Sequence, residues 1–215
     1  MAKEITKKED RRVTYTKNAI KDALLDALRH KPFEKLSISA VCADAQITRT
    51  TFYTHYENLN QVLDELICEA FEMAAESASA VHLSFPERMV YLTRFNTAEE
   101  LREHNGDLPT CQRIADTPKY RVLFQDGTIS DYIQNKLFLM LKPTVVPELA
   151  EYCLVSPQEA EAMFHYFLSG SYALNSALGW IKDDRWFSMR LHVIHLEAAG
   201  LEAIRQRNLK TGTRS

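Results

Sequence analysis

The chain has 215 residues, of which 46% are apolar and 26% are charged, with only 6 Gly and 7 Pro. This length supports a buried core without a disulfide or a metal, and the composition excludes disordered and collagen-like proteins. Charge is uneven, because residues 1–60 carry a net +3 and residues 61–215 a net −6, as expected when one end of a protein meets a polyanion.

The cysteines and the amino terminus indicate a cytoplasmic protein. Cys42, Cys68, Cys111 and Cys153 lie 26, 43 and 42 residues apart, which fits neither a zinc site nor a compact disulfide framework. The first residues are charged and contain no apolar stretch, so we expect no secretory signal. Residues 162–181 lack Asp, Glu, Lys and Arg but contain too many polar residues for a membrane span.

The first predicted helix begins near Thr16, after a basic flexible arm over residues 1–13. Its apolar residues recur at spacings of three and four, which is typical of an amphipathic helix. These residues are Ile20, Ala23, Leu24, Ala27 and Leu28. Pro32 disfavours helical backbone at Lys31, so the helix is expected to end there.

Two short helices follow. Ser37 or Ser39 can begin the second helix by accepting a hydrogen bond from an otherwise unpaired backbone N–H. A tight turn over residues 45–47 leads to Thr48, which caps a third helix from Arg49 to about Tyr56. Three helices with this turn form a helix-turn-helix, whose third helix can enter the major groove of DNA.

The remaining chain is predicted to be helical as well. A connecting helix over about 59–76 leads to helices near 86–104, 108–116, 129–142, 157–180 and 186–208. We expect breaks at Pro86, Asn105-Gly106, Pro118, Gly127, Pro143 with Pro147, and Asp183-Asp184. The fold class is therefore all-α, with a helix-turn-helix head over 14–60 and a larger helical effector-binding and dimerisation body over 61–215.

The run Thr-Arg-Thr-Thr-Phe-Tyr-Thr-His-Tyr at residues 48–56, with Thr16–Leu28 and Ser37–Cys42 before it, resembles the head of TetR/AcrR transcriptional regulators. The resemblance covers the head alone, and the body is similar only in its all-helical architecture. It implies a homodimer that binds a palindromic operator on double-stranded DNA and responds to a small-molecule or protein effector.

Two positions depart from the family pattern. Gln46 stands in the turn where the family usually has Gly, and a positive φ there costs on the order of 1 kcal/mol. Leu59 stands where a phosphate-binding Lys is common. The phosphate anchor is then missing or supplied by other residues, namely Asn58, Asn60 or the basic tail of Lys7, Lys8, Arg11 and Arg12.

The recognition helix offers several side chains to DNA. Arg49 can donate two hydrogen bonds to guanine O6 and N7, worth roughly 1–3 kcal/mol of discrimination, or can be a solvated surface residue. The resemblance implies that Tyr53 and His55 donate to phosphate oxygens; alternatively, Tyr53 belongs half to the core and His55 is a surface residue. We expect Tyr56 to pack under the head. The predicted DNA-binding residues are Thr16, Ser37, Ser39, Thr48, Arg49, Thr50, Thr51, Tyr53 and His55.

Two further sites are predicted in the body. Aromatic residues are expected to line an effector pocket or to be ordinary core: Phe71, Tyr91, Phe95, Phe124, Tyr132, Phe138, Phe164, His165 and Tyr172. A stripe on the last two helices resembles the dimer face of the family, or is core within one chain: Met163, Phe167, Ser171, Leu174, Trp186, Met189, Val193 and Leu196.

The sequence thus favours an effector-responsive repressor. An alternative is a helical interaction module whose degenerate head binds a protein partner. Catalysis is not expected, because no nucleophile, phosphate-loop or metalloprotease motif is present. His192 and His195 near Glu197 suggest a metal site only weakly, and no cofactor or metal is expected.

Overall fold

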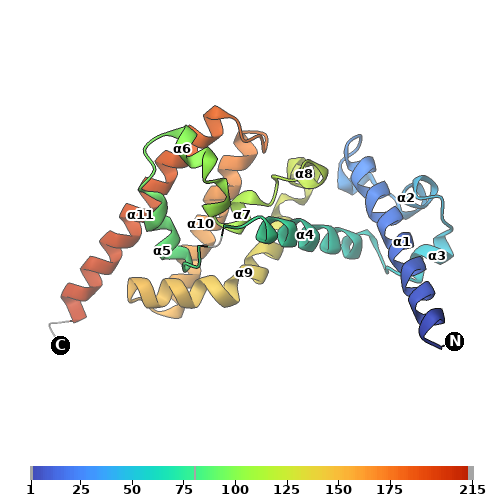
Figure 1. Cartoon of the computed structure of the whole chain (residues 1–215), viewed down its shortest axis with the longest axis horizontal. Coiled ribbons are helices and arrows are strands. Elements are labelled where there is room, and N and C mark those ends of the chain that lie inside the picture. Colours follow the sequence, from blue (N-terminus) through green and yellow to red (C-terminus); the bar gives the residue numbers. More distant parts are fainter. Residues whose placement is uncertain (1, 80, 213–215) are drawn as a thin grey trace. The chain divides into compact units, whose positions relative to one another are not determined.

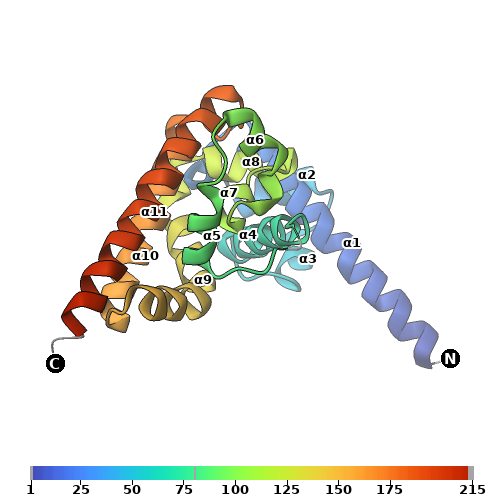
Figure 2. The same cartoon turned by 60° about the vertical axis from the view of Figure 1, so that its left-hand side comes forward.

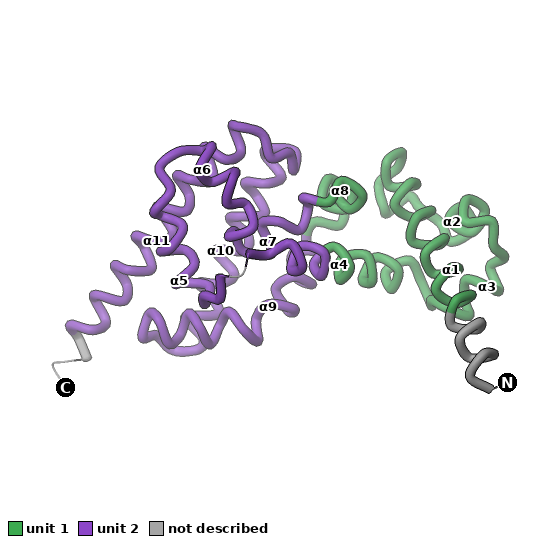
Figure 3. Tube along the Cα trace, in the orientation of Figure 1, with its two compact units in different colours: residues 1–70, 117–130 green, residues 71–116, 131–215 purple. Residues whose placement is uncertain are grey.

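The computed structural model describes residues 2–79 and 81–212, and every regular element in these ranges is helical (Figure 1). This confirms the predicted all-α class. The chain divides into two compact units: residues 1–70 with 117–130, and residues 71–116 with 131–215 (Figure 3). We refer to them as the first unit and the second unit.

The first unit contains the predicted helix-turn-helix. Its helices are α1 (Ala2–Leu28), α2 (Ile38–Asp44), α3 (Arg49–Tyr53), most of α4 (Leu59–Glu76) and α8 (Pro118–Gln125). Helix α1 packs against α2 and α8, and α2 packs against α3. Apolar side chains from these helices form one buried core, including Ile20, Leu24, Val41, Phe52, Val62, Leu63 and Leu66.

The boundaries of α1 correct one prediction. The helix begins at Ala2 rather than near Thr16, so the helical backbone includes most of the segment expected to be an arm. Its carboxyl end at Leu28 lies before Pro32, as predicted. The amphipathic pattern of residues 20–28 marks only the part of α1 that packs on the core, because helix outside the core needs no apolar stripe.

Helix α8 was missed in the sequence. Pro118 was expected to break the chain, but it occupies the first turn of α8, where a residue without an N–H is tolerated. The segment is tied to the first unit by two contacts. The Lys119 ammonium lies 2.8 Å from Asp22, and the Phe33 backbone N–H donates to the Asp126 carboxylate at 2.7 Å.

The second unit is built from α5 (Phe85–Leu92), α6 (Ala98–Glu103), α7 (Thr110–Arg113), α9 (Ser130–Cys153), α10 (Pro157–Ala177) and α11 (Asp184–Gly212). Helix α11 packs against α5 and α6 (Figure 2). The helix expected over 86–104 is two helices, because Thr97 and Glu100 form a capping box that begins α6. The helix expected over 108–116 shrinks to one turn.

Helix α9 continues past two expected breaks. Pro143 and Pro147 lie inside it, although each removes one backbone hydrogen bond. Buried side chains at Val145, Val146 and Leu149 follow within the same stretch. Burial of this apolar surface offsets the lost bonds, and tertiary packing therefore overrides the local signal.

The predicted connecting helix over 59–76 agrees with α4. The boundary between the compact units falls inside that helix, after residue 70, and the functional division into a head over 14–60 and a body over 61–215 stays a prediction. Within the described residues, no helix combines the length and apolarity that a bilayer crossing requires.

Candidate nucleic-acid interface

Helix α3 is anchored by one apolar side chain. Phe52 is fully buried, and its ring meets those of Tyr53 and Tyr56 at centroid distances of 5.6 and 5.8 Å. Thr48 begins the helix, as predicted, by accepting a hydrogen bond from the Thr51 backbone N–H. Helix α3 ends at Tyr53 rather than near Tyr56, so a short helix presents its outer face to solvent.

The outer face of α3 carries the predicted base-reading residues. Thr48, Arg49, Thr50 and Tyr53 are exposed, whereas Thr51 is half-buried. The Arg49 guanidinium donates to the Tyr53 hydroxyl at 3.4 Å and lies 5.9 Å from the ring centroid. This hydrogen bond raises the pKa of Arg49. The group therefore stays fully charged and is preoriented along the helix.

The turn before α3 is strained, as its sequence suggested. Gln46 has a φ of 55°, in the left-handed region that Gly adopts without strain. The Ile47 backbone N–H donates to the Cys42 carbonyl at 3.0 Å, which is the bond expected after a left-handed residue at a helix end. The turn thus keeps its required geometry at a cost of about 1 kcal/mol.

The recognition helix is braced from below by Tyr56, as predicted. Tyr56 is 3% exposed and its hydroxyl donates to the Glu65 carboxylate on α4 at 2.7 Å. Burial and this bond raise the pKa of Tyr56. Although burial opposes it, hydrogen bonds from Lys17 and Tyr56 hold the pKa of Glu65 below its ordinary value. Helices α1 and α4 and the end of the recognition segment thus share one polar contact.

Two predicted phosphate contacts, Ser37 and Ser39, lie at the start of α2. Ser37 caps α2 by accepting from the Ala40 backbone N–H, and both Ser37 and Ser39 are exposed. His55 is half-buried just after α3. The prediction that Thr16 lies at a helix start is wrong. Thr16 lies inside α1, and its hydroxyl donates to the Arg12 carbonyl. Since its own N–H lies within the helix, Thr16 offers no helix-start amide to a phosphate.

Several residues were expected to bind phosphate in place of the lysine that is absent at position 59. Leu59 is 9% exposed and belongs to the core. Asn58 uses its side-chain oxygen to accept from the Gln61 backbone N–H. Asn60 is exposed, as are Arg11 and Arg12 on α1, while Lys7 and Lys8 fall outside the described side chains. These exposed residues remain available for phosphate.

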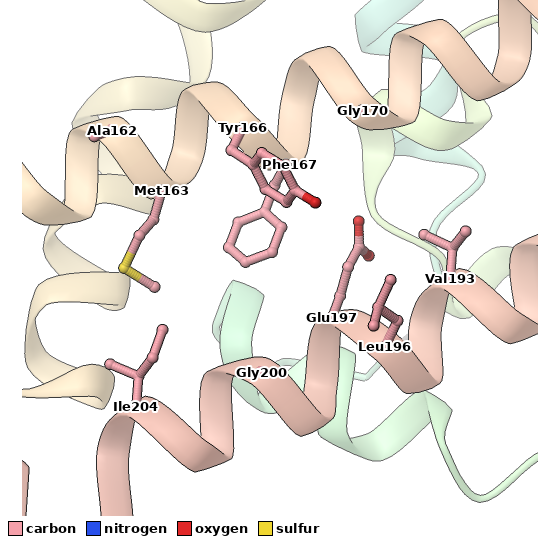
Figure 4. A pocket seen from close by; sticks show the side chains of 10 residues that line it. All are labelled: Ala162, Met163, Tyr166, Phe167, Gly170, Val193, Leu196, Glu197, Gly200 and Ile204. Atoms are coloured by element: carbon pink, nitrogen blue, oxygen red, sulfur yellow. The ribbon is translucent and has the colours of Figure 1, made fainter. Parts of the chain in front are cut away.

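A groove of about 630 Å³ lies between α10 and α11 in the second unit (Figure 4). It contains four residues predicted for the dimer face, Met163, Phe167, Val193 and Leu196. It also contains six residues outside the set predicted for the dimer face, namely Ala162, Tyr166, Gly170, Glu197, Gly200 and Ile204. A signal for two of them was present, since a glycine inside a helix usually has a packing or functional reason.

Two residues predicted for the dimer face belong instead to the core. Trp186 is fully buried and its indole N–H donates to Asn175 at 2.7 Å. Ser171 is 6% exposed and accepts from Arg190. Both residues belong to the predicted apolar stripe, but their side chains are buried within this chain. Met189 is exposed and Leu174 is half-buried, and both stay predictions.

The aromatic residues predicted for an effector pocket fall into separate clusters. Phe138 stacks on Phe164 and on His165, at centroid distances of 5.2 and 3.7 Å. Tyr91 meets Phe95 edge-on, and Tyr172 meets Trp180. The other three are distributed more widely: Phe71 on α4, Tyr132 exposed on α9, and Phe124 buried in the first unit. The effector pocket stays a prediction.

A small hollow of about 200 Å³ lies beside His165, between polar residues of α9 and α10. The histidines considered for a metal are placed differently. His192 and His195 are exposed on α11, whereas Glu197 is buried and paired with Arg190 at 3.1 Å. Across the described residues, no three His, Cys, Asp or Glu side chains are grouped to hold a metal.

Comparison with known proteins adds one partial similarity. The chain is 38% identical over 66 residues to a Bacillus subtilis (strain 168) protein described as the uncharacterized HTH-type transcriptional regulator YxbF. The match covers 30% of this chain and 17% of that relative, so the chain spans a small part of the protein it resembles. No family model and no solved structure matches the chain.

Proposed function

We propose that the protein is a TetR-type transcriptional regulator that binds double-stranded DNA as a homodimer and acts as an effector-responsive repressor. The observation that carries this proposal is the exposed row of Arg49, Thr50 and Tyr53 on a short helix fixed by buried Phe52. A helix of this kind fits the major groove. The partial similarity to a helix-turn-helix transcriptional regulator supports the same reading.

The homodimer is supported by the groove between α10 and α11. Gly170 and Gly200 both line it, and a Cβ added to either would meet nothing within 4 Å. Glycine inside a helix costs about 1 kcal/mol relative to alanine, and packing within this chain does not require it here. Close approach of a second copy gives both positions a reason. Leu196, 69% exposed beside them, supplies apolar surface for the contact.

Effector response is proposed to work by population shift. An effector that binds the DNA-incompetent state more tightly than the DNA-competent state lowers the fraction bound to the operator. The chain crosses between the compact units three times, after residues 70, 116 and 130. We propose that a rearrangement of the second unit is transmitted to the first unit through these three chain connections. We propose no catalytic role and no cofactor.

The test is selection from random duplex DNA with purified protein at about 0.15 M salt, because phosphate-driven affinity depends steeply on salt. The expected result is a palindrome with half-sites about one helical turn, roughly 34–36 Å, apart. Sedimentation of the same protein should show a dimer. A folded dimer that enriches no sequence, with or without candidate effectors, would favour the interaction-module alternative.

A further inference from the structure

The helix-turn-helix itself carries little positive charge. Residues 37–60, from the start of α2 to the start of α4, contain one basic residue, Arg49, and two acidic residues, Asp44 and Glu57, for a net −1. The start of α4 adds no cation, because Leu59 is buried in the core. Contacts of lysine and arginine with phosphates supply a large share of the affinity of a protein for DNA. A protein that binds DNA with this surface therefore needs cations from elsewhere in the first unit.

An excess of basic residues precedes α2. Residues 1–36 contain ten Lys or Arg and six Asp or Glu, for a net +4. Three of these cations form ion pairs within the chain: Lys17 with Glu65, Lys21 with Glu69, and Arg29 with Asp26. Arg11 and Arg12 are both exposed, and neither guanidinium has an ion pair or a hydrogen bond with a residue that the structure describes. These two cations are therefore available to a ligand.

Helix α1 carries Arg11 and Arg12 beyond the core of the first unit. The fully buried face of α1 begins at Ile20. Arg11 precedes Ile20 by nine residues, which is about 13.5 Å along a helix. Figure 2 shows α1 extending past α2 and α3 toward its amino terminus. Because the side chains of Arg11 and Arg12 contribute nothing to the core, packing does not account for their place on the helix.

Tyr15 lies on the same face of α1 as the two arginines. It follows Arg11 by four residues and Arg12 by three, the spacings at which residues of a helix are neighbours. The side chain of Tyr15 is 78% exposed, and within the described part of the chain its hydroxyl has no hydrogen-bond partner. Tyrosine hydroxyls, like guanidinium groups, donate hydrogen bonds to DNA phosphates. One face of α1 thus presents two charged donors and one neutral donor.

We propose that Arg11, Arg12 and Tyr15 bind phosphates of the DNA backbone and supply the charged contacts that the helix-turn-helix lacks. Phosphate contacts carry no direct base preference, because every sequence presents the same phosphate oxygens. The three residues therefore contribute affinity and salt dependence, while α3 determines the preferred sequence. This inference rests on the proposed function and assigns phosphate-binding residues to it.

The test is the dissociation constant for the selected operator between about 0.05 and 0.2 M salt. Each substitution removes two contacts from the complex of a dimer with its operator. Arg11→Gln and Arg12→Gln should each reduce the slope of log Kd against log salt by about 1.8, and should weaken binding about 30-fold at 0.15 M salt. Arg11→Lys and Arg12→Lys should keep the slope, because an ammonium also binds phosphate as a point charge.

Tyr15→Phe distinguishes a positioned phosphate contact from general attraction between charges. It removes two neutral hydrogen bonds from the complex and should weaken binding about 30-fold on every sequence. The salt slope should not change, because a neutral donor releases no counter-ions. Lys31→Gln, at an exposed lysine just after the other end of α1, is the matched control for lost charge and should keep the slope of the full chain.

The outcomes separate this inference from the proposed function. A full chain that binds no duplex at any of these salt concentrations overturns the proposed function, and this inference with it. A chain that binds its operator with the same slope after Arg11→Gln and Arg12→Gln overturns only the phosphate contacts.

Two further results would also overturn the phosphate contacts. One is a loss of affinity in the glutamine variants that depends on the flanking bases, which would assign the arginines to base reading. The other is an equal loss of slope in Lys31→Gln, which would show that only the net charge of the protein matters. Because all three side chains lie outside the core, their variants should unfold at the same denaturant concentration as the full chain.

Discussion

The Tyr120 hydroxyl on α8 donates to the Glu69 carboxylate on α4 at 3.1 Å, joining residues 51 positions apart in the sequence. The same carboxylate receives the ammonium of Lys21 from α1. Burial, with the neighbouring Glu69 charge, raises the pKa of Tyr120 to about 12. Three helices of the first unit thus meet at one acidic residue.

Glu69→Ala should destabilise the first unit more than Tyr120→Phe, because Tyr120 is a neutral partner of Glu69 and Lys21 is a charged one. Glu69→Ala leaves Lys21, whose side chain is 9% exposed, without its closest counter-ion, and should cost about 2 kcal/mol of unfolding free energy. Tyr120→Phe should cost about 1 kcal/mol. Urea denaturation measures both. Equal, near-zero losses would show that α1, α4 and α8 are held by apolar packing alone.

Base reading should depend on Arg49. Arg49→Ala is expected to relax preference at one base position in each half-site and to cost about 1–3 kcal/mol there. The measurement is binding to the selected operator and to its single-base variants. Arg185→Ala, at an exposed residue of α11, is the control for lost positive charge. If both variants weaken binding equally on every sequence, Arg49 contacts phosphate rather than a base.

The turn before the recognition helix should tolerate glycine better than its own residue. Gln46 has a φ of 55°, and Gln46→Gly relieves strain of about 1 kcal/mol, partly offset by the greater freedom of the unfolded chain. A net gain of about 0.5 kcal/mol is expected in denaturant unfolding. Gln46→Ala keeps the strain and should bring no gain, so identical results for the two variants would contradict this account.

Two substitutions of Gly170 should distinguish the stability of the single subunit from the strength of dimerisation. Gly170→Ala enters open space and should stabilise the monomer by about 0.5–1 kcal/mol through helix propensity. Gly170→Leu should weaken the dimer, because its side chain occupies the volume the second copy needs. Sedimentation and unfolding at low protein concentration measure the two effects. Gly127→Ala, outside the groove, is the control, and a dimer indifferent to leucine at position 170 would place the interface elsewhere.

The free energy of unfolding at alkaline pH should depend on the protonation of Lys182. Burial lowers its pKa to about 8, against an ordinary 10.5, although Asp116 lies 2.7 Å away and opposes the shift. Between these values the unfolded chain binds more protons at this site than the folded chain. The contribution of this site to the unfolding free energy therefore rises with pH across this window, and is lost as pH falls through about 8.

Lys182→Met should remove that rise. The difference in unfolding free energy between the wild type and Lys182→Met is expected to change by up to about 3 kcal/mol between the two pKa values. Lys31→Met, at an exposed lysine, should run parallel to the wild type. A Lys182→Met curve that also runs parallel would mean that the side chain keeps its ordinary pKa in the folded chain.

Sequence periodicity and capping chemistry predicted much of this protein. The apolar spacing of residues 20–28 and 59–74, and the caps at Ser37 and Thr48, determined the class and the short helices of the head. These signals are local, since a cap or an amphipathic stripe acts within one or two helical turns. The missing glycine likewise marked Gln46 as the residue that would be strained by a positive φ, and its φ is 55°.

Only the tertiary structure decided which faces of the helices are core. Trp186 and Leu196 belong to the same apolar pattern on α11, yet the first is fully buried and the second is 69% exposed. The continuation of α9 through Pro143 and Pro147, and the place of α8 beside α1, depend on partners distant in sequence. Periodicity shows that a stripe is apolar, but the packing of other helices determines which part of it is left for a second chain.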